Sequence, residues 1–232
     1  MSASSLRARV RVEMIEEIKA AARKRLAVDG ANLSLRGVAR DMDIVASALY
    51  RYFPSRDDLL TALILEAYQS LGAAATTAAG EIPAADHRTR WLAVCTAVRD
   101  WATAHRPEYG LLYGNPLPGY SAPQDTVAPA AVVVLLLSEI AETAFASGKL
   151  TPPALPSALP GPVSDDLRTL IEDKGSALPA EVLDRVFAAW TQLFGLVTFE
   201  TFGRLDGLVQ ARTDYFTHHM NLMADLVGLP AA

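Results

Sequence analysis

Residues 43–54 of the chain read Asp43-Ile44-Val45-Ala46-Ser47-Ala48-Leu49-Tyr50-Arg51-Tyr52-Phe53-Pro54. A helix of this length is not stable alone and must be held by packing against other segments. Ile44, Leu49 and Phe53 recur at one- or two-turn intervals and can anchor it to a core. The polar side stays available to an outside partner and carries Ser47, Tyr50, Arg51 and Tyr52.

The segment before this stretch, residues 33–42, supplies the packing partner. It predicts a second short helix that is capped by Ser34. Its inward face carries Leu35, Val38, Ala39 and Met42. Two short helices joined by a three- or four-residue turn form a helix-turn-helix, whose second helix fits the major groove of DNA.

The motifs Ser34-Leu35-Arg36-Gly37-Val38-Ala39-Arg40 and Ala48-Leu49-Tyr50-Arg51-Tyr52-Phe53-Pro54-Ser55-Arg56-Asp57-Asp58-Leu59 resemble the amino-terminal signature of TetR-family transcriptional regulators. The resemblance runs from about Met14 to Leu71. Two positions depart from the family pattern: Asp43 stands where the turn often has Gly, and Val45 stands where Ser or Thr often caps the recognition helix. Asp tolerates a left-handed backbone, so we expect the turn to survive. The missing cap costs about 1 kcal/mol.

The family resemblance assigns the positions of Tyr50, Tyr52 and Arg56 mainly to DNA phosphates, and those of Val45, Ala46 and Ser47 to the groove floor. Hydroxyl groups and helix-start amides suit phosphate oxygens, whereas base identity is read at the exposed start of the helix. Two alternatives are a half-buried structural Tyr50 and a merely solvated Arg51. The expected DNA-binding residues are Ser34, Arg36, Val45, Ala46, Ser47, Tyr50, Arg51, Tyr52 and Arg56.

The net charge of −5 is unevenly distributed. Residues 1–60 hold 11 Lys or Arg against 8 Asp or Glu, and residues 61–232 hold 10 against 18. Salt screens charges over about 8–10 Å, so the negative charge of residues 61–232 has little effect at a distance. The net positive residues 1–60 can therefore still attract DNA phosphates. Arg7, Arg9 and Arg11 fit either a flexible basic arm that reaches the backbone or minor groove, or an ordinary solvated terminus.

Composition places the chain among folded, soluble proteins. It has 232 residues, of which 51% are apolar, and a single cysteine, Cys95, so a cysteine-rich metal site or disulfide framework is excluded. The first eleven residues lack a signal-peptide core, and the longest apolar run, residues 127–137, is interrupted by Pro129. We therefore expect a cytoplasmic protein.

The apolar periodicity predicts an all-α fold with three parts: a helix-turn-helix head at 1–54, a linking helix at 55–80 and a ligand-binding and dimerisation body at 81–232. Residues 73–83 suggest a fraying helix end followed by a loop. Residues 109–123, after Pro107, suggest a loop with a defined shape. The proline-rich residues 151–162 suggest an extended insert. The remaining helices are expected at 7–28, 88–106, 127–147 (buried), 165–172, 180–202 and 208–226.

The last two helices suggest an antiparallel hairpin that pairs with its copy in a four-helix dimer interface, as the TetR resemblance also implies. Two heads about one helical turn apart on DNA would supply the specificity. The expected interface residues are Val182, Val186, Leu193, Val197, Val209, Phe216, Met220 and Met223. The body also resembles the family subset named for a Trp, His, Gly signature, on residues 189–195, 105–107 and 114–116, although Phe194 replaces the histidine.

A regulator of this class needs a ligand cavity, which is mostly apolar with a few polar groups. Candidate wall residues are Trp91, Trp101, His105, Tyr109, Tyr113, Phe145, Trp190, Phe194 and Glu200, each of which could equally be packed core. No cofactor is expected. His105 suits a helix cap better than a metal ligand, and His218 and His219 are adjacent and point to different sides of a helix, so no metal site is expected.

These features favour a homodimeric transcriptional regulator, most simply a repressor that a small apolar or aromatic effector releases from a palindromic operator. No hydrolase, metalloprotease, P-loop or dinucleotide motif is present, so an enzyme is disfavoured. The alternative is a protein of the same fold that has lost specific DNA binding and serves as a ligand- or partner-binding protein.

Overall fold

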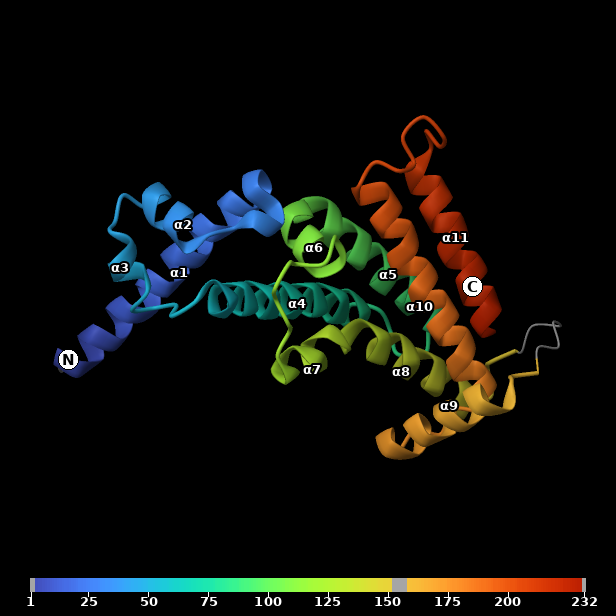
Figure 1. Cartoon of the computed structure of the whole chain (residues 1–232). Coiled ribbons are helices and arrows are strands. Elements are labelled where there is room, and N and C mark those ends of the chain that lie inside the picture. The colour runs from blue at the N-terminus through green and yellow to red at the C-terminus, as the bar shows by residue number, and fades with distance from the viewer. Residues whose placement is uncertain (1–2, 152–157, 231–232) are drawn as a thin grey trace. The chain divides into compact units, whose positions relative to one another are not determined.

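The computed structural model describes residues 3–151 and 158–230, and these residues form helices and turns with no strand among them (Figure 1). The all-α prediction is therefore confirmed. The chain divides into two compact units. The first comprises residues 1–70 and 104–129, and the second comprises residues 71–103 and 130–232. The predicted boundaries at 54 and 80 do not coincide with this division, because residues 104–129 join the head and α4 (Arg56–Gly80) contributes to both units.

The first unit is built on α1 (Ala3–Asp29), which packs against α2 (Leu35–Asp41) and α6 (Arg106–Tyr113). The short α3 (Ala46–Leu49) packs against α2, and a single 3-10 turn, η1 (Gly30–Asn32), follows α1. The apolar stripe of α1 recurs at three- and four-residue intervals, so one face enters the core. The buried core includes Ile18, Ala22, Leu26, Leu35, Val38, Leu49, Leu59, Leu60, Leu63 and Leu111.

The start of α4 is fixed by a reciprocal capping arrangement. The backbone N–H of Asp58 donates to Ser55 Oγ at 3.1 Å, and Asp58 Oδ2 accepts from the backbone N–H of Ser55 at 2.9 Å. Both bonds satisfy amides that a helix start otherwise leaves unpaired. Arg23 of α1 also donates to Glu66 of α4 at 2.6 Å. The start of α4 is thus capped by its own side chains, and an ion pair further along joins α4 to α1.

Residues 109–113 form part of α6, so the prediction of a loop there is wrong. Pro107 lies in the first turn of α6, and the N–H of Tyr109 donates to the carbonyl of His105 at 2.8 Å. Proline lacks an N–H and has a fixed φ, so it begins a helix as readily as it ends one. The predicted loop is confined to the residues after Gly114, where a 3-10 turn, η2 (Gln124–Thr126), and a short helix, α7 (Val127–Ala130), follow.

The second unit contains α5 (His87–Ala104), α8 (Val132–Ala146), α9 (Gly161–Lys174), α10 (Ala180–Thr201) and α11 (Arg212–Val227). α10 packs against α8, α9 and α11, and α10 and α11 form the predicted hairpin. Its core is apolar and includes Trp91, Val94, Val98, Leu137, Ile140, Val186, Leu193 and Met220. Arg88 fixes the carboxyl-terminal end by donating to the carbonyl of Pro230 and to Asn221 and Asp225.

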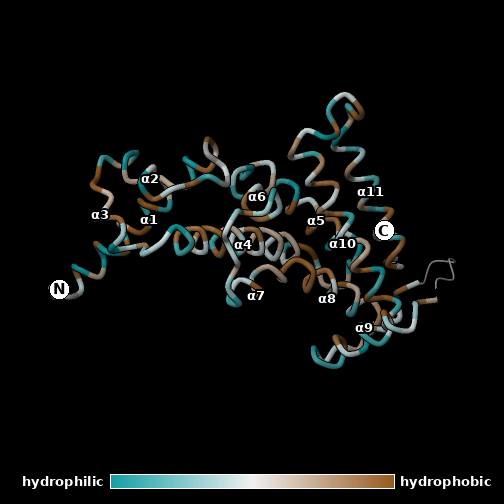
Figure 2. Tube along the Cα trace, in the orientation of Figure 1, coloured by the Kyte–Doolittle hydropathy of each residue, from teal (hydrophilic) through white to brown (hydrophobic). Residues whose placement is uncertain are grey.

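The predicted single buried helix at 127–147 is two helices, α7 and α8, bent by 42° where they meet. Pro129 lies within α7, just before the bend, and its missing N–H removes one hydrogen bond to the preceding turn. α8 is largely hydrophobic (Figure 2), yet it is not buried all round. Leu135 is 48% exposed and Phe145 is 41% exposed.

Three other helix limits differ from the predictions. α4 continues as regular helix to Gly80, because Leu71, Ala75 and Ala79 keep one face buried through the alanine-rich stretch. α11 begins at Arg212 and not near Leu208, which is 76% exposed in the preceding turn. α9 spans residues 161–174, and residues 152–157 of the proline-rich insert lie outside the described residues.

By length and composition alone, α4 and α10 could cross a membrane, and the bent α7–α8 pair could be a third span. The length of uninterrupted apolar runs did not indicate these possible spans. Isolated polar residues end such a run, although they lower the mean hydropathy of the whole helix only slightly. Of the most hydrophobic 18-residue stretch, 44% is buried inside the protein in α4 and 39% in α10.

Candidate nucleic-acid interface

The turn between α2 and α3 is made by Asp43, which has a φ of 54° and is the one non-glycine residue with positive φ in the described parts of the chain. Its N–H donates to the carbonyl of Arg40 at 3.2 Å, and the N–H of Ile44 donates to the carbonyl of Ala39 at 3.0 Å. Aspartate tolerates this left-handed conformation. The predicted turn is therefore formed without glycine.

One side of α3 is anchored in the core and the other side is exposed. Leu49 is fully buried, whereas Val45 is 71% exposed and Tyr50 is 43% exposed. Ser47 and Arg51 are exposed as well. The side of α3 that faces away from the core is therefore accessible to a partner. Tyr50 is not a core residue.

α3 is shorter than the predicted stretch and begins without a side-chain cap. Val45 is its N-cap residue and makes no side-chain cap bond. After Leu49 the chain turns, and the N–H groups of Tyr52 and Phe53 both donate to the carbonyl of Leu49, at 2.9 and 3.1 Å. The predicted cap deficiency is thus present in the structure.

The remaining predicted contact residues belong to α2 and to the start of α4. Ser34 caps α2, with its Oγ accepting from the N–H of Gly37 at 3.2 Å, and Arg36 is exposed. The half-buried Arg56 donates from Nε to the carbonyl of Leu33 at 2.9 Å and lies 3.6 Å from the Asp57 carboxylate. This bond gives Arg56 a structural role that the sequence motif did not indicate.

Sequence reasoning also missed a contact between the first helix and the turn after α3. The guanidinium carbon of Arg11 lies 5.3 Å from the centre of the Tyr52 ring, in a cation–π arrangement. Arg7 and Arg11 lie on a helix that begins at Ala3, so they belong to an ordered element and not to a flexible arm. The sequence contained one indication of this arrangement, because Arg7 and Arg11 are four residues apart and therefore lie on the same side of a helix.

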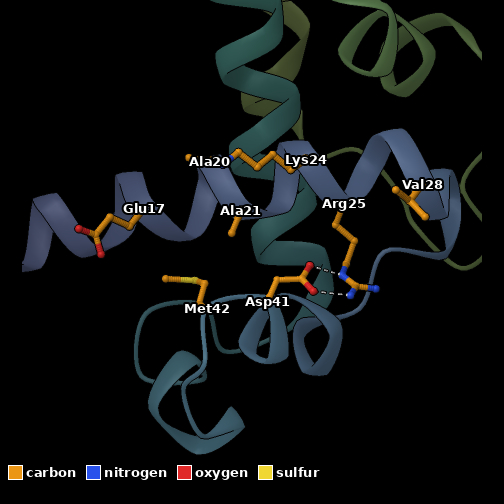
Figure 3. Close-up of a pocket in the computed structure, with 8 residues that line it drawn as sticks. All are labelled: Glu17, Ala20, Ala21, Lys24, Arg25, Val28, Asp41 and Met42. Atoms are coloured by element: carbon orange, nitrogen blue, oxygen red, sulfur yellow. Dashed lines mark hydrogen bonds and ion pairs between the residues drawn. The ribbon is translucent and has the colours of Figure 1, made fainter.

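A cleft in the head, of about 620 Å³, lies between α1 and the end of α2 (Figure 3). Its wall includes an ion pair between Arg25 and Asp41. The other lining residues are Glu17, Ala20, Ala21, Lys24, Val28 and Met42. Charges of both signs line it, so it offers no single-sign surface to DNA.

The predicted effector-site residues of the first unit are His105, Tyr109 and Tyr113. Tyr109 is fully buried, and its ring centre lies 5.0 Å from that of Tyr113, which in turn lies 6.2 Å from that of Tyr68 of α4. Burial raises the pKa of Tyr113 far above its ordinary value. His105 is the N-cap residue of α6 and makes no side-chain cap bond. The tyrosines form a packed cluster that joins α4 to α6.

In the second unit, Trp91 and Trp101 are buried in α5, whereas Phe145 is exposed. Trp190 and Phe194 contact each other on α10, with ring centres 6.1 Å apart. Among the buried side chains that the structure describes, the Trp91 Nε1–H donor has no hydrogen-bond partner. Such an unsatisfied donor costs stability, so a group that accepts from it would be favoured.

Glu200 is engaged inside the protein. Its carboxylate accepts two hydrogen bonds from Arg99, at 2.6 and 2.7 Å, and both side chains are largely buried. Arg99 also lies over the Phe216 ring of α11. The sequence suggested Glu200 as a polar cavity group, but the structure shows it linking α10 to α5. Burial also raises the pKa of the Cys95 thiol, so a reactive thiolate is disfavoured.

Six of the eight predicted dimer-interface residues are buried inside the protomer. Their side chains fill the space between α10, α11 and the neighbouring helices, because the strongest apolar stripe of each helix serves the protomer's own core. These six are Val182, Val186, Leu193, Val197, Phe216 and Met220. Val209 and Met223 are half-buried. Among outward residues, Phe199 is 46% exposed and Leu222 is 42% exposed.

The histidines of α11 contact each other and a neighbouring tyrosine. The rings of His218 and His219 lie 5.6 Å apart, and the His219 ring lies 4.3 Å from that of Tyr215. No cluster of three metal-binding side chains includes them in the part of the chain that the structure describes.

Two family models match the chain. One, described as bacterial regulatory proteins of the tetR family, matches residues 18–63. The other, described as the tetracyclin repressor-like C-terminal domain, matches residues 91–223. The first match contains α2, α3 and the start of α4, and the second contains most of α5 to α11.

Curated relatives and solved structures agree with these matches. The HTH-type transcriptional regulators Rv1816 of Mycobacterium tuberculosis and Mb1846 of Mycobacterium bovis are each 34% identical to the chain over 175 residues, covering 75% of this chain and 74% of theirs. The regulatory protein SCO4313 has a crystal structure that superposes with a TM-score of 0.75 at 28% identity, covering 94% of this chain and 98% of that one. The TetR-family regulator PfmR of Thermus thermophilus shares the fold, with a TM-score of 0.60 at 19% identity over 92% of this chain and 99% of its own.

Proposed function

Because the chain belongs to the TetR family of bacterial transcriptional regulators, we propose that it is a cytoplasmic repressor that binds a palindromic operator as a homodimer and leaves it when a small effector binds. The observation that carries the proposal is that α3 is anchored in the core on one side and exposed on the other. Leu49 is fully buried while Val45, Ser47, Tyr50 and Arg51 are exposed. A short helix held in this way can enter the major groove.

The proposed DNA contacts follow from the chemistry of each exposed group. Ser47 can exchange hydrogen bonds with a base edge, and Val45 or Ala46 can contact a thymine methyl group. Tyr50, Tyr52 and Arg51 suit phosphate oxygens, as do Ser34 and Arg36 at the start of α2. Arg56 acts on the same surface mainly by holding the Leu33 carbonyl.

The dimer would form through the outward faces of α10 and α11 and not through the residues buried in the protomer. Ala188, Gly195 and Phe199 are exposed along α10, and Leu222 is exposed on α11 beside the half-buried Met223. Leu222→Arg should therefore convert a dimer to a monomer in sedimentation velocity. Val163→Arg, which changes a 40% exposed valine of α9, serves as the control.

The effector would be a small molecule with apolar or aromatic groups and one hydrogen-bond acceptor. Among the described buried side chains, Trp91 Nε1 is the donor without a hydrogen-bond partner, and Trp101, Trp190 and Phe194 are aromatic residues of the same unit. Binding there would tilt α4, which contributes to both units, and change the separation of the two α3 helices. An effector that binds without weakening DNA affinity would contradict this mechanism.

The operator is tested by selecting the purified protein on a pool of random duplexes near physiological salt and sequencing the bound fraction. We expect a palindrome whose half-sites lie about one helical turn apart. Recovery of no motif would favour the second candidate function, a ligand- or partner-binding protein without specific DNA binding. The uncapped start of α3 is the observation that favours this second candidate.

A further inference from the structure

The head contains a cleft of about 470 Å³ at the amino-terminal end of α1. Its lining comes from two elements: one face of α1, and the turn that follows α3. The α1 residues recur at i, i+1, i+4 and i+5, so they share one side of the helix. The lining residues are Leu6, Arg7, Val10, Arg11, Arg51 and Tyr52. Every charged side chain in this lining is an arginine.

The position of Arg11 is set by the neighbouring aromatic ring. Its guanidinium carbon lies 5.3 Å from the Tyr52 ring centre, so the cation is held over the ring while the side chain stays exposed to solvent. Arg51 comes from the residue next to Tyr52 and lines the same cleft. Three guanidinium groups around one small space repel each other, and an anion between them removes that repulsion.

The chemistry of the cleft matches a phosphodiester group. A guanidinium donates two parallel hydrogen bonds to phosphate oxygens, and Arg is preferred over Lys for such bidentate contacts. Leu6 and Val10 are each 48% exposed and give the cleft an apolar wall. A deoxyribose next to a bound phosphate would contact such a wall.

We propose that this cleft receives one phosphate of the operator backbone in each head, so that α1 contributes Arg7 and Arg11 to DNA binding in addition to α2 and α3. The proposal rests on the proposed function, since it names a further contact for the same DNA. It also gives the amino-terminal end of α1 a role in setting the register of the head on the duplex. This contact, which we call the phosphate clamp, consists of the cleft arginines around one phosphate. It fixes how α3 lies in the groove, without reading bases.

The test uses the full-length dimer and the duplex obtained from the selection. Binding of Arg7→Gln/Arg11→Gln is measured by fluorescence anisotropy between about 50 and 300 mM salt. Loss of one phosphate contact in each of two heads should lower the magnitude of the log–log salt slope by about 1.8, since each contact contributes about 0.9. Affinity should fall about tenfold for each head. The selected sequence motif should stay the same.

Arg9→Gln is the matched control for Arg11→Gln. It removes the same charge from α1, at a position two residues before Arg11. Arg9 lies outside the cleft lining and 3.6 Å from Glu13. Arg11→Gln should weaken binding and reduce the salt slope, whereas Arg9→Gln should leave both close to the wild-type values. Equal effects of the two substitutions, or no effect of the double variant, would overturn the phosphate clamp.

The failure of this inference is distinguishable from failure of the proposed function. If the wild-type protein selects a palindrome and the double variant binds it with an unchanged salt slope, only the clamp is wrong. If the wild-type protein selects no motif, the operator function itself is wrong, and the clamp with it. Far-UV circular dichroism of each variant verifies that α1 remains helical, which the exposed positions of Arg7 and Arg11 favour.

Discussion

The guanidinium group of Arg25 donates two hydrogen bonds to the carboxylate of Asp41, from Nε to Oδ2 and from Nη2 to Oδ1, each 2.7 Å long (Figure 3). The pair joins α1 to the last turn of α2. Gly37 lies directly beside it, because a Cβ at that position would be 2.9 Å from the Arg25 guanidinium carbon. This contact therefore fixes α2 on α1, and with it the turn that positions α3.

Asp41→Asn should destabilise the head at neutral pH, because it removes the charge that accepts both bonds. The hydrogen bond from Arg25 is the main reason that the pKa of Asp41 lies below its ordinary value of 3.8. The stabilisation is thus present above pH 3.8 and is lost as the pH falls through the lower pKa of the folded state. Thermal unfolding curves of wild type and variant should differ at pH 7 and converge below pH 3.8.

Asp43→Asn provides the control for this experiment. It removes one negative charge from the adjacent turn, and Asn also tolerates the positive φ of this position. If Asp43→Asn lowers the unfolding temperature as much as Asp41→Asn, the effect reflects net charge and not the Arg25 contact.

Val45→Ser should stabilise α3 by about 1 kcal/mol, because it supplies the side-chain cap that the helix start lacks. Little burial is lost, since Val45 is 71% exposed. For a chain of this size the unfolding temperature should rise by about 2–4 °C. Val12→Ser changes another exposed valine, within α1, and should give no such rise.

Ser47→Ala should change the base preference at one position of each half-site, by about 1–3 kcal/mol between the preferred base and its competitors. Ser47 is exposed on α3 and has the only hydroxyl among residues 44–49. Arg51→Gln should instead weaken all sequences alike and reduce the salt slope. Repeating the duplex selection with both variants separates base reading from phosphate contact, and unchanged motifs with Ser47→Ala would remove Ser47 from base recognition.

Glu200→Ala should destabilise the second unit by about 3 kcal/mol, because Arg99 loses its carboxylate partner in a largely buried position. The Glu200 carboxylate raises the pKa of Arg99, which therefore stays charged. Glu181→Ala, at an exposed position of the same helix, should have a much smaller effect. Urea unfolding of both variants measures the difference.

The double variant Arg99→Leu/Glu200→Leu removes both charges and should recover part of the lost stability. No recovery would mean that the two side chains do not act as a pair. An effector that binds Glu200→Ala as tightly as wild type would confirm that Glu200 has a structural role and no ligand contact.

His87→Gln should reduce the acid sensitivity of the second unit. His87 is 3% exposed, and burial is the main cause of its lowered pKa, with further contributions from the charges of Lys149 and Arg90. A histidine with a lowered pKa in the folded state loses stability as the pH falls below its unfolded value of 6.5, since the unfolded chain then binds the additional proton. The unfolding temperature of wild type should therefore fall below pH 6.5 more steeply than that of the variant. His218→Gln, at an exposed position, should follow the wild-type curve.

Local sequence patterns were sufficient to predict the helices and the turn of the head. The spacing of Leu35, Val38 and Leu49, the cap at Ser34 and the capping pair Ser55–Asp58 are local patterns, and the helices, the turn at Asp43 and the family follow from them. Local patterns are reliable here because helix starts and tight turns are decided by neighbouring residues. The all-α class and the hairpin of the last two helices also followed from periodicity.

Only the tertiary structure shows whether an apolar face packs in the core or stays exposed, and which charged residue a side chain pairs with. Periodicity identifies a face but not its partner, so it predicts interface positions for the buried residues Val186 and Met220 and a cavity position for the ion-paired Glu200. Proline ends or begins a helix with the same local chemistry, so α6 could not be distinguished from a loop. The pairing of Arg25 with Asp41, and of Arg11 with Tyr52, joins residues 16 and 41 positions apart, and only folding brings such residues together.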